Sequence, residues 1–188
     1  MILALLLASP ALAEGTEEPS FSVGFAGAWA IPTETQPIGY HHLRQDIAAS
    51  VIGQWQYRRA LIQAEILHSG FSAKNPELTS FGLRVGAVLY KGVADLYATA
   101  GVSYMTYGAK SDTECSNFGC NPLAGNGPAL LGEVGLLLPF PEGFLMRPAA
   151  IAQLFFPLFT VEQDIYGHTS ADAAPVVLLG FRLLFGPR

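Results

Sequence analysis

His68 and Ser69 are the residues whose types most directly suggest catalysis. A histidine can act as general base for a serine hydroxyl, and the activated hydroxyl can attack an ester when the two groups lie within hydrogen-bond reach. Consecutive side chains of an extended strand, however, point to opposite faces. His68 and Ser69 are therefore the catalytic candidates of the sequence, but their adjacency would direct the two side chains to opposite faces of a strand.

Two further groups of residues have metal-binding or redox chemistry. Cys115 and Cys120 are separated by four residues in a loop-like segment with no histidine close by, and two thiols are too few for a metal site. We predict that they form a disulfide. His41, His42 and His168, with Asp164 and Asp172, follow no known ligand spacing. We therefore predict no metal and no cofactor.

The composition excludes some classes of function. Hydrophobic residues make up 51% of the 188 residues, charged residues only 13%, and the formal net charge is −5. An acidic, weakly charged chain lacks the basic surface that nucleic acid requires. The mean hydropathy is +0.35, yet outside the N-terminus there is no uninterrupted apolar run of ~18 residues such as a spanning helix needs. Frequently interrupted apolarity is typical of a membrane β-barrel.

The N-terminus predicts export. The segment MILALLLASPALAEG is apolar and reaches an A-x-A cleavage pattern at Ala11-Leu12-Ala13, although no Lys or Arg precedes the apolar run. We predict a signal peptide over residues 1–13, a short periplasmic leader over 14–19 and a barrel over 20–188. Export also places the cysteines in an oxidising compartment, where a disulfide can form.

The rest of the chain alternates with a period of two residues, which predicts β-strands with two distinct faces. In the last strand Val177, Leu179, Phe181, Leu183 and Phe185 share one face, and Gly180 and Arg182 lie on the other. The predicted fold class is all-β, an eight-stranded antiparallel up-and-down transmembrane β-barrel. The strands are expected at about Phe21–Ile31, Gln45–Tyr57, Ala60–Phe71, Leu78–Tyr90, Asp95–Tyr107, Pro128–Leu138, Phe144–Phe156 and Ala174–Phe185.

The connectors tend to alternate between short and long, as outer-membrane barrels require for periplasmic turns and external loops. Arg58-Arg59, Lys91-Gly92 and Pro139–Gly143 mark the short turns. With a periplasmic N-terminus, the longer connectors all fall outside: Pro32–Arg44, Ser72–Glu77, Gly108–Gly127 and Pro157–Ala173.

The inward phase of the predicted strands collects charges of both signs. A closed barrel would bring together a lumen charge network of Glu65, Arg84, Glu133, Arg147 and Arg182. An eight-stranded barrel is narrow enough for side chains to fill, and buried charges must be paired. We expect a packed polar plug; a narrow ion path is the alternative.

Aromatic residues gather near the predicted strand ends, as in the girdles that flank a membrane band. They are Trp29, Trp55, Tyr57, Tyr90, Tyr104, Tyr107, Phe144, Phe156 and Phe185. A soluble lipocalin-like barrel would instead place its polar phase outside. Because the polar phase here holds glutamines and charges of both signs, the pattern favours lipid on the outside.

With these strands, connectors and a terminal aromatic strand, residues 20–185 resemble the OmpA/OmpX-like small outer-membrane barrels. The resemblance is one of pattern, with no specific motif. It implies a bacterial outer-membrane location and insertion by the barrel-assembly machinery, which in such proteins reads a final aromatic residue. Here Phe185 is followed by Gly186-Pro187-Arg188.

A second resemblance concerns His68 and Ser69. The segment KNPEL (Lys74 to Leu78) resembles a loop of the lipid A deacylase family, whose outer-membrane barrels use a His and a nearby Ser with a carboxylate. In that family the His and Ser are two residues apart and share a strand face. Here they are adjacent, so a strand would direct them to opposite faces.

We therefore expect a structural or surface-interaction role, with the external loops as the contact surface. The alternatives are a lipid-modifying, deacylase-like enzyme and a narrow channel; the sequence favours no enzymatic activity. The expected partners are outer-membrane lipid, the barrel-assembly machinery and an unknown extracellular ligand, with no nucleic acid, and the chain is expected to be a monomer.

Overall fold

The computed structural model describes residues 19–32, 46–70, 77–108, 125–138, 146–164 and 168–186. These residues form strands, listed here with their bounds: β1 Ser20–Pro32, β2 Asp46–Tyr57, β3 Ala60–Ser69, β4 Glu77–Tyr90, β5 Asp95–Gly108, β6 Gly125–Leu137, β7 Met146–Pro157, β8 Thr160–Asp164, β9 His168–Asp172 and β10 Val176–Phe185. None of the described segments contains a helix with the length and apolarity needed to cross a bilayer.

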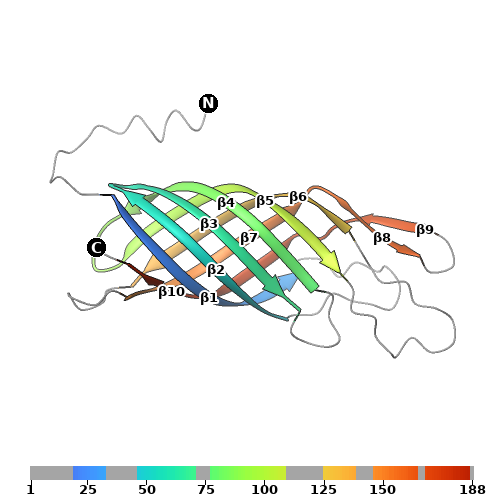
Figure 1. The fold of residues 1–188 in the computed structure, drawn as a ribbon, viewed down its shortest axis with the longest axis horizontal. Helices are drawn as coiled ribbons and strands as arrows, with labels where there is room; N and C mark the ends of the chain where they lie inside the picture. The colour runs from blue at the N-terminus through green and yellow to red at the C-terminus, as the bar shows by residue number, and fades with distance from the viewer. Residues whose placement is uncertain are drawn as a thin grey trace.

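Eight of these strands form one closed barrel in the order β1-β10-β7-β6-β5-β4-β3-β2 (Figure 1). Every neighbouring pair is antiparallel, and β1 closes the barrel against β10 through a register that runs from Val23↔Phe185 to Pro32↔Val176. The predicted fold class is therefore confirmed: an all-β, eight-stranded, antiparallel up-and-down barrel.

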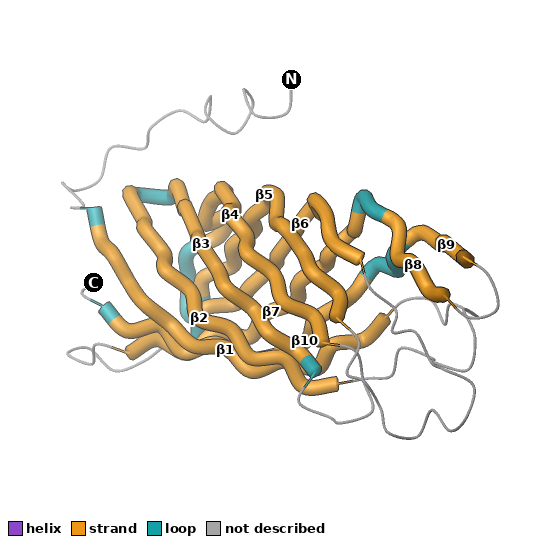
Figure 2. The backbone as a smooth tube through the Cα atoms, turned by 45° about the vertical axis from the view of Figure 1, so that its right-hand side comes forward, coloured by secondary structure: helices purple, strands orange, loops and turns teal. Residues whose placement is uncertain are grey.

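The register between strands fixes the width of the barrel. Following paired residues once around from Phe21 leads back to β1 at Ile31, a shift of ten residues. With ~3.3 Å per residue along a strand and ~4.7 Å between strands, this shift tilts the strands by roughly 40°. Figure 2 shows the tilted strands wrapping around one axis. Such a barrel has room inside for side chains and little else.

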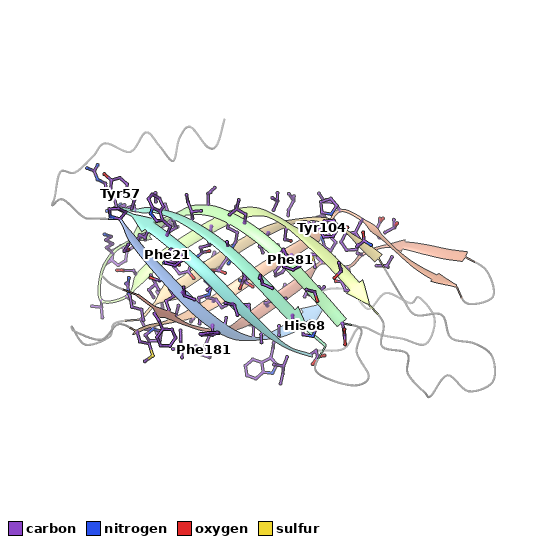
Figure 3. All side chains as sticks on the ribbon, viewed as in Figure 1. Phe21, Tyr57, His68, Phe81, Tyr104 and Phe181 are labelled. Atoms are coloured by element: carbon purple, nitrogen blue, oxygen red, sulfur yellow. The ribbon has the colours of Figure 1, made fainter. Side chains whose placement is uncertain are left out.

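The outward row of each barrel strand is largely apolar and exposed. Phe25, Leu83, Val102 and Phe181, for example, are each more than half exposed, and Figure 3 shows Phe21, Phe81, Tyr104 and Phe181 on the outer surface. On β1 the outward row runs from Phe21 to Ile31, a height of about 25 Å at this tilt. An apolar exterior of this height matches the hydrocarbon core of a thin bilayer.

The aromatic residues predicted to form girdles divide between the two faces. Trp29, Trp55, Tyr57, Tyr90, Tyr104, Phe156 and Phe185 are exposed on the exterior. The prediction that Tyr107 belongs to a girdle is wrong, because this residue is 6% exposed and its ring lies 5.9 Å from that of Phe159. It shares the inward phase of β5 with Met105, so it packs in the core. Phe144 lies outside the described residues.

The structure differs from the sequence-based expectation in one loop and at several strand ends. The predicted loop Pro157–Ala173 contains a two-stranded hairpin, β8 with β9. Strand β6 begins at Gly125 and passes through Pro128, three residues earlier than predicted. Pro148 neither ends β7 nor shifts its register with β10, and its carbonyl accepts a hydrogen bond from the Leu138 amide at 2.8 Å.

Candidate functional site: a buried charge network

Four strands place a charged side chain inside the barrel. Glu65 of β3, Arg84 of β4, Glu133 of β6 and Arg182 of β10 are each 4% exposed or less. All four belong to the inward phase of their strands, because side chains alternate across a strand and the apolar alternates face outward. Two carboxylates and two guanidinium groups leave the group formally neutral.

Small residues on the neighbouring strands make room for these long side chains. Gly82 lies opposite Glu65, and Gly101 lies opposite Arg84. Arg182 is flanked by Ala26 on β1 and Ala149 on β7. In a barrel this narrow, small inward neighbours leave the volume that these long side chains fill.

Glu133 lies at the centre of the network. Its Oε2 accepts from Arg84 Nη1 at 2.6 Å and from Arg182 Nη2 at 2.7 Å. Its Oε1 accepts from Arg182 Nη1 at 2.6 Å and from the Tyr97 hydroxyl at 2.7 Å. Arg182 thus holds Glu133 through two parallel hydrogen bonds, the strongest form of this ion pair.

Glu65 completes the network on the other side. Its carboxylate lies 2.8 Å from Arg84 Nη2 and 3.5 Å from Arg182 Nη2. It also accepts from the Ser50 hydroxyl and, at 2.9 Å, from Gln153 Nε2. Because Gln153 donates to Glu133 as well, it bridges the two carboxylates.

Apolar layers lie on both sides of the polar level. Inward residues of β3 read Leu61, Gln63, Glu65, Leu67, and those of β6 read Leu131, Glu133, Gly135, Leu137. The apolar members of these rows are each 3% exposed or less. Two separate apolar clusters result, one with Leu67, Met105 and Phe155 and the other with Ile52, Leu61 and Leu184. The ion pairs are therefore enclosed between two layers of apolar side chains.

Arg147, the fifth residue of the predicted lumen charge network, lies elsewhere. Its Nη2 is 3.0 Å from Asp95 Oδ2, and the two side chains are 28% and 21% exposed. Arg147 shares the inward phase of β7 with Gln153, but it is the second residue of that strand, six positions before Gln153. The inward phase alone does not determine where along the barrel axis a side chain lies. Arg147 is separated from the other four charges along this axis.

His68 and Ser69 point to opposite sides of β3, as their adjacency requires. Ser69 is 4% exposed and belongs to the interior. His68 is half-buried on the outer side (Figure 3), where its Nδ1 is 3.1 Å from the Thr79 hydroxyl. The two side chains do not form a base–nucleophile pair in this arrangement.

The other predicted chemistry lies mostly beyond what the structure describes. Cys115, Cys120, His41 and His42 fall outside the described residues. The described part of the chain contains no group of three or more His, Cys, Asp or Glu side chains that could hold a metal ion.

Sequence reasoning missed several members of the network. Tyr97 and Gln153 each contact Glu133, and Ser50 contacts Glu65. Gln63 accepts from Thr99 at 3.2 Å and donates to Gln54 at 2.9 Å. The signal was present, since all of these residues lie in the inward phase, but only the charged residues of that phase were selected as site candidates.

Solved structures of several outer-membrane proteins resemble this fold. Neisserial surface protein A matches with a TM-score of 0.55 at 10% identity, over 92% of this chain and 99% of that chain. OprG from Pseudomonas aeruginosa matches with a TM-score of 0.60 at 11% identity, over 91% and 98%. AlkL, solved in lipid bilayers, matches with a TM-score of 0.51 at 13% identity, over 94% and 95%.

Neither a protein-family model nor a curated protein sequence matches the chain. The solved structures are outer-membrane barrels that align over nearly their whole length. Their likeness and the apolar exterior bear out the bacterial outer-membrane location that the sequence predicted. The chain has the fold of the small eight-stranded outer-membrane barrels, the OmpA/OmpX-like kind of barrel.

Proposed function

We propose that this protein is a non-conducting outer-membrane barrel with a structural or surface-interaction role, whose external connectors form the contact surface. The observation that carries the proposal is the enclosed charge network. Arg84, Glu133 and Arg182 are at most 2% exposed and are engaged with one another. An ion crossing the barrel would have to separate these pairs and pass two apolar layers, which is costly without water.

The hairpin β8–β9 supports the surface role. It continues beyond the barrel at one end (Figure 1), the end at which β1 and β5 finish and β2 and β6 begin. Near its base, Val161 and Ala173 are buried against the apolar cluster that contains Phe155. The hairpin thus packs its base into the end of the barrel and extends beyond it, which suits contact with a partner outside the cell.

Several predictions from the sequence remain part of this proposal. Residues 1–13 are removed as a signal peptide, residues 14–19 form a periplasmic leader, and Cys115 and Cys120 form a disulfide. The barrel-assembly machinery inserts the chain, which acts as a monomer. Mass spectrometry of the protein from outer membranes, with and without reduction, tests the cleavage site and the disulfide together.

Planar-bilayer recording tests the closed interior. Refolded protein at 1 M KCl is expected to give no discrete conductance steps. F155A, which removes a fully buried aromatic ring from one apolar layer, serves as the comparison, because loss of that ring opens space next to the ion pairs. Discrete steps from the wild-type barrel, altered in size by R84Q or R182Q, would show instead that the protein is a narrow channel.

Epitope insertion tests the surface role. A tag placed between Asp164 and His168, the ends of the two hairpin strands, is expected to bind antibody on intact cells. The matched control is a tag between Arg58 and Arg59, which should bind only after the outer membrane is permeabilised. The opposite labelling pattern would reverse the orientation and remove the hairpin as an external contact surface.

A further inference from the structure

The two-residue turn between β2 and β3 has an unusual residue in its first position. Arg58 has a backbone φ of 54°, in the left-handed region, and is the non-glycine residue with positive φ among those described. Two-residue hairpin turns that need a positive φ at this position favour glycine, which adopts it without strain. The backbone therefore gains nothing from arginine here, and the side chain is the feature to explain.

The Arg58 side chain lies against an aromatic stack. Its guanidinium carbon is 5.4 Å from the centroid of the Tyr57 ring, and the Tyr57 ring stacks on that of Trp55 at 6.1 Å. Both rings are more than one third exposed. Gln56 Nε2 donates to the Arg58 carbonyl at 3.1 Å and so helps to hold the turn. Stacked rings with a cation at their edge are suited to the boundary between hydrocarbon and headgroups.

Further cations lie on the same rim of the barrel. Arg59 is exposed beside Arg58, and its carbonyl accepts from the Val88 amide at 2.8 Å, which ties this turn to β4. Strand β4 ends at Tyr90, 63% exposed, and Lys91 follows in the next turn. Asp95, the carboxylate of this turn, is engaged with Arg147 and with the Gly92 amide.

The two rims of the barrel differ in charge. At the opposite end, β2 begins at Asp46, β4 begins at Glu77 and β9 ends at Asp172. The described residues thus place acidic side chains where the strands reach the predicted external end, and exposed cations at the short turns.

We propose that Trp55, Tyr57, Arg58, Arg59, Tyr90 and Lys91 form a basic aromatic rim that binds the headgroups of anionic phospholipids. The rim continues the lipid-facing exterior, so lipid already surrounds it, and its charge selects the anionic kind. The assignment to the inner leaflet rests on the proposed orientation, because short turns face the periplasm. Cations at a membrane surface attract anionic lipids in this way, within about a Debye length.

Tryptophan quenching by brominated lipids tests the proposal. The sequence contains two tryptophans, so W29F leaves Trp55 as the reporter inside the rim. The refolded variant is placed in phosphatidylcholine vesicles that contain a rising fraction of either brominated phosphatidylglycerol or brominated phosphatidylcholine. Both leaflets have the same composition, so the direction of insertion does not affect the readout.

At low salt the expected preference at Trp55 for phosphatidylglycerol over phosphatidylcholine is roughly threefold to tenfold. At 1 M salt it should fall toward one, since the Debye length shortens from about 10 to about 3 Å. In W29F/R58Q/R59Q/K91Q it should be near one at low salt as well. W29F/R58G, which keeps the positive φ without strain and removes one cation, should fold normally and show a reduced preference.

Two controls locate the effect. In W55F the reporter is Trp29, which lies on β1 near the end of the barrel opposite the rim. It should show no preference for phosphatidylglycerol over phosphatidylcholine. W29F/D95N/R147Q should keep the preference of W29F, because it removes both members of the Arg147–Asp95 pair and leaves the net charge of this end of the barrel unchanged.

Three results would overturn the proposal. They are a preference near one in W29F, a preference that survives loss of all three cations, and an equal preference at Trp29. If inorganic phosphate at millimolar concentration abolishes the preference, the rim binds free phosphate and the lipid assignment is wrong. Conductance and surface labelling test the proposed function separately, so failure of one does not imply failure of the other.

Discussion

At the scale of single residues, Glu133 has the largest consequence. It accepts hydrogen bonds from Arg84, Arg182, Tyr97 and Gln153 while 2% exposed. Desolvating four charges costs several kcal/mol for each ion, and only their mutual pairing offsets that cost. The network is therefore sensitive to the loss of any one member, although it contributes little net stability as a whole.

Neutralising Glu133 tests this sensitivity. E133Q leaves two buried guanidinium groups facing the single carboxylate of Glu65. The free energy of unfolding should therefore fall by about 3–5 kcal/mol. The measurement is the urea midpoint of the barrel in detergent micelles. E133Q/R182Q restores the balance of charge and should lose less stability than the sum of the two single variants.

Arg147 provides the matched comparison. Its pair with Asp95 is partly exposed, and such pairs contribute about 0.2–1 kcal/mol. R147Q should therefore shift the midpoint far less than E133Q. Equal shifts for the two variants would mean that water reaches the interior network, which contradicts the enclosed arrangement.

At the scale of the strands, glycines set how closely neighbouring strands approach. A Cβ on Gly101 of β5 would lie 1.9 Å from the Leu83 carbonyl oxygen and 2.7 Å from the Arg84 Cα on β4. Both atoms belong to backbone, so neither can move without shifting the strand. Gly132 of β6 differs, because a Cβ there would meet no atom within 4 Å.

These two glycines make a paired test of strand packing. G101A should destabilise the barrel by about 1–3 kcal/mol, since overpacking displaces backbone next to Arg84. G132A places its methyl group on the open exterior and should be neutral or slightly stabilising, because glycine weakens a strand. The readout is the denaturant midpoint together with the refolded fraction. A midpoint for G101A as little changed as that of G132A would contradict the closeness of β4 and β5.

At the scale of the whole molecule, period-two alternation predicted the barrel strands and their faces. It did not predict where a residue lies along the barrel axis. That position depends on the register between strands, and the register arises from pairing between residues that are remote in sequence. Arg147 was accordingly grouped with four charges that it does not join. Strands β8 and β9 were missed because five-residue strands with polar residues on both faces give no clear alternation.

The network was also predicted only in part, for a physical reason. Charges are conspicuous in an inward row, whereas Tyr97, Ser50 and Gln153 are ordinary residues until the register brings them to the carboxylates. Likewise the positive φ of Arg58 follows from the geometry of a two-residue turn, and it cannot be predicted from the residue type. The local alternation of residue types predicts which face of a strand each residue occupies. Contacts between residues follow only from the closed barrel, which sets the register between strands.

Heat modifiability of the chain from Glu14 onward, refolded in detergent, is the most direct test of a closed barrel with a lipid-facing exterior. A closed barrel with a lipid-facing exterior should run as a compact form on a gel without boiling, shift on boiling, and give a β-rich circular dichroism spectrum. A chain that is soluble without detergent and shows no shift would contradict the account, because the exposed apolar face would then have to be the interior of a soluble barrel.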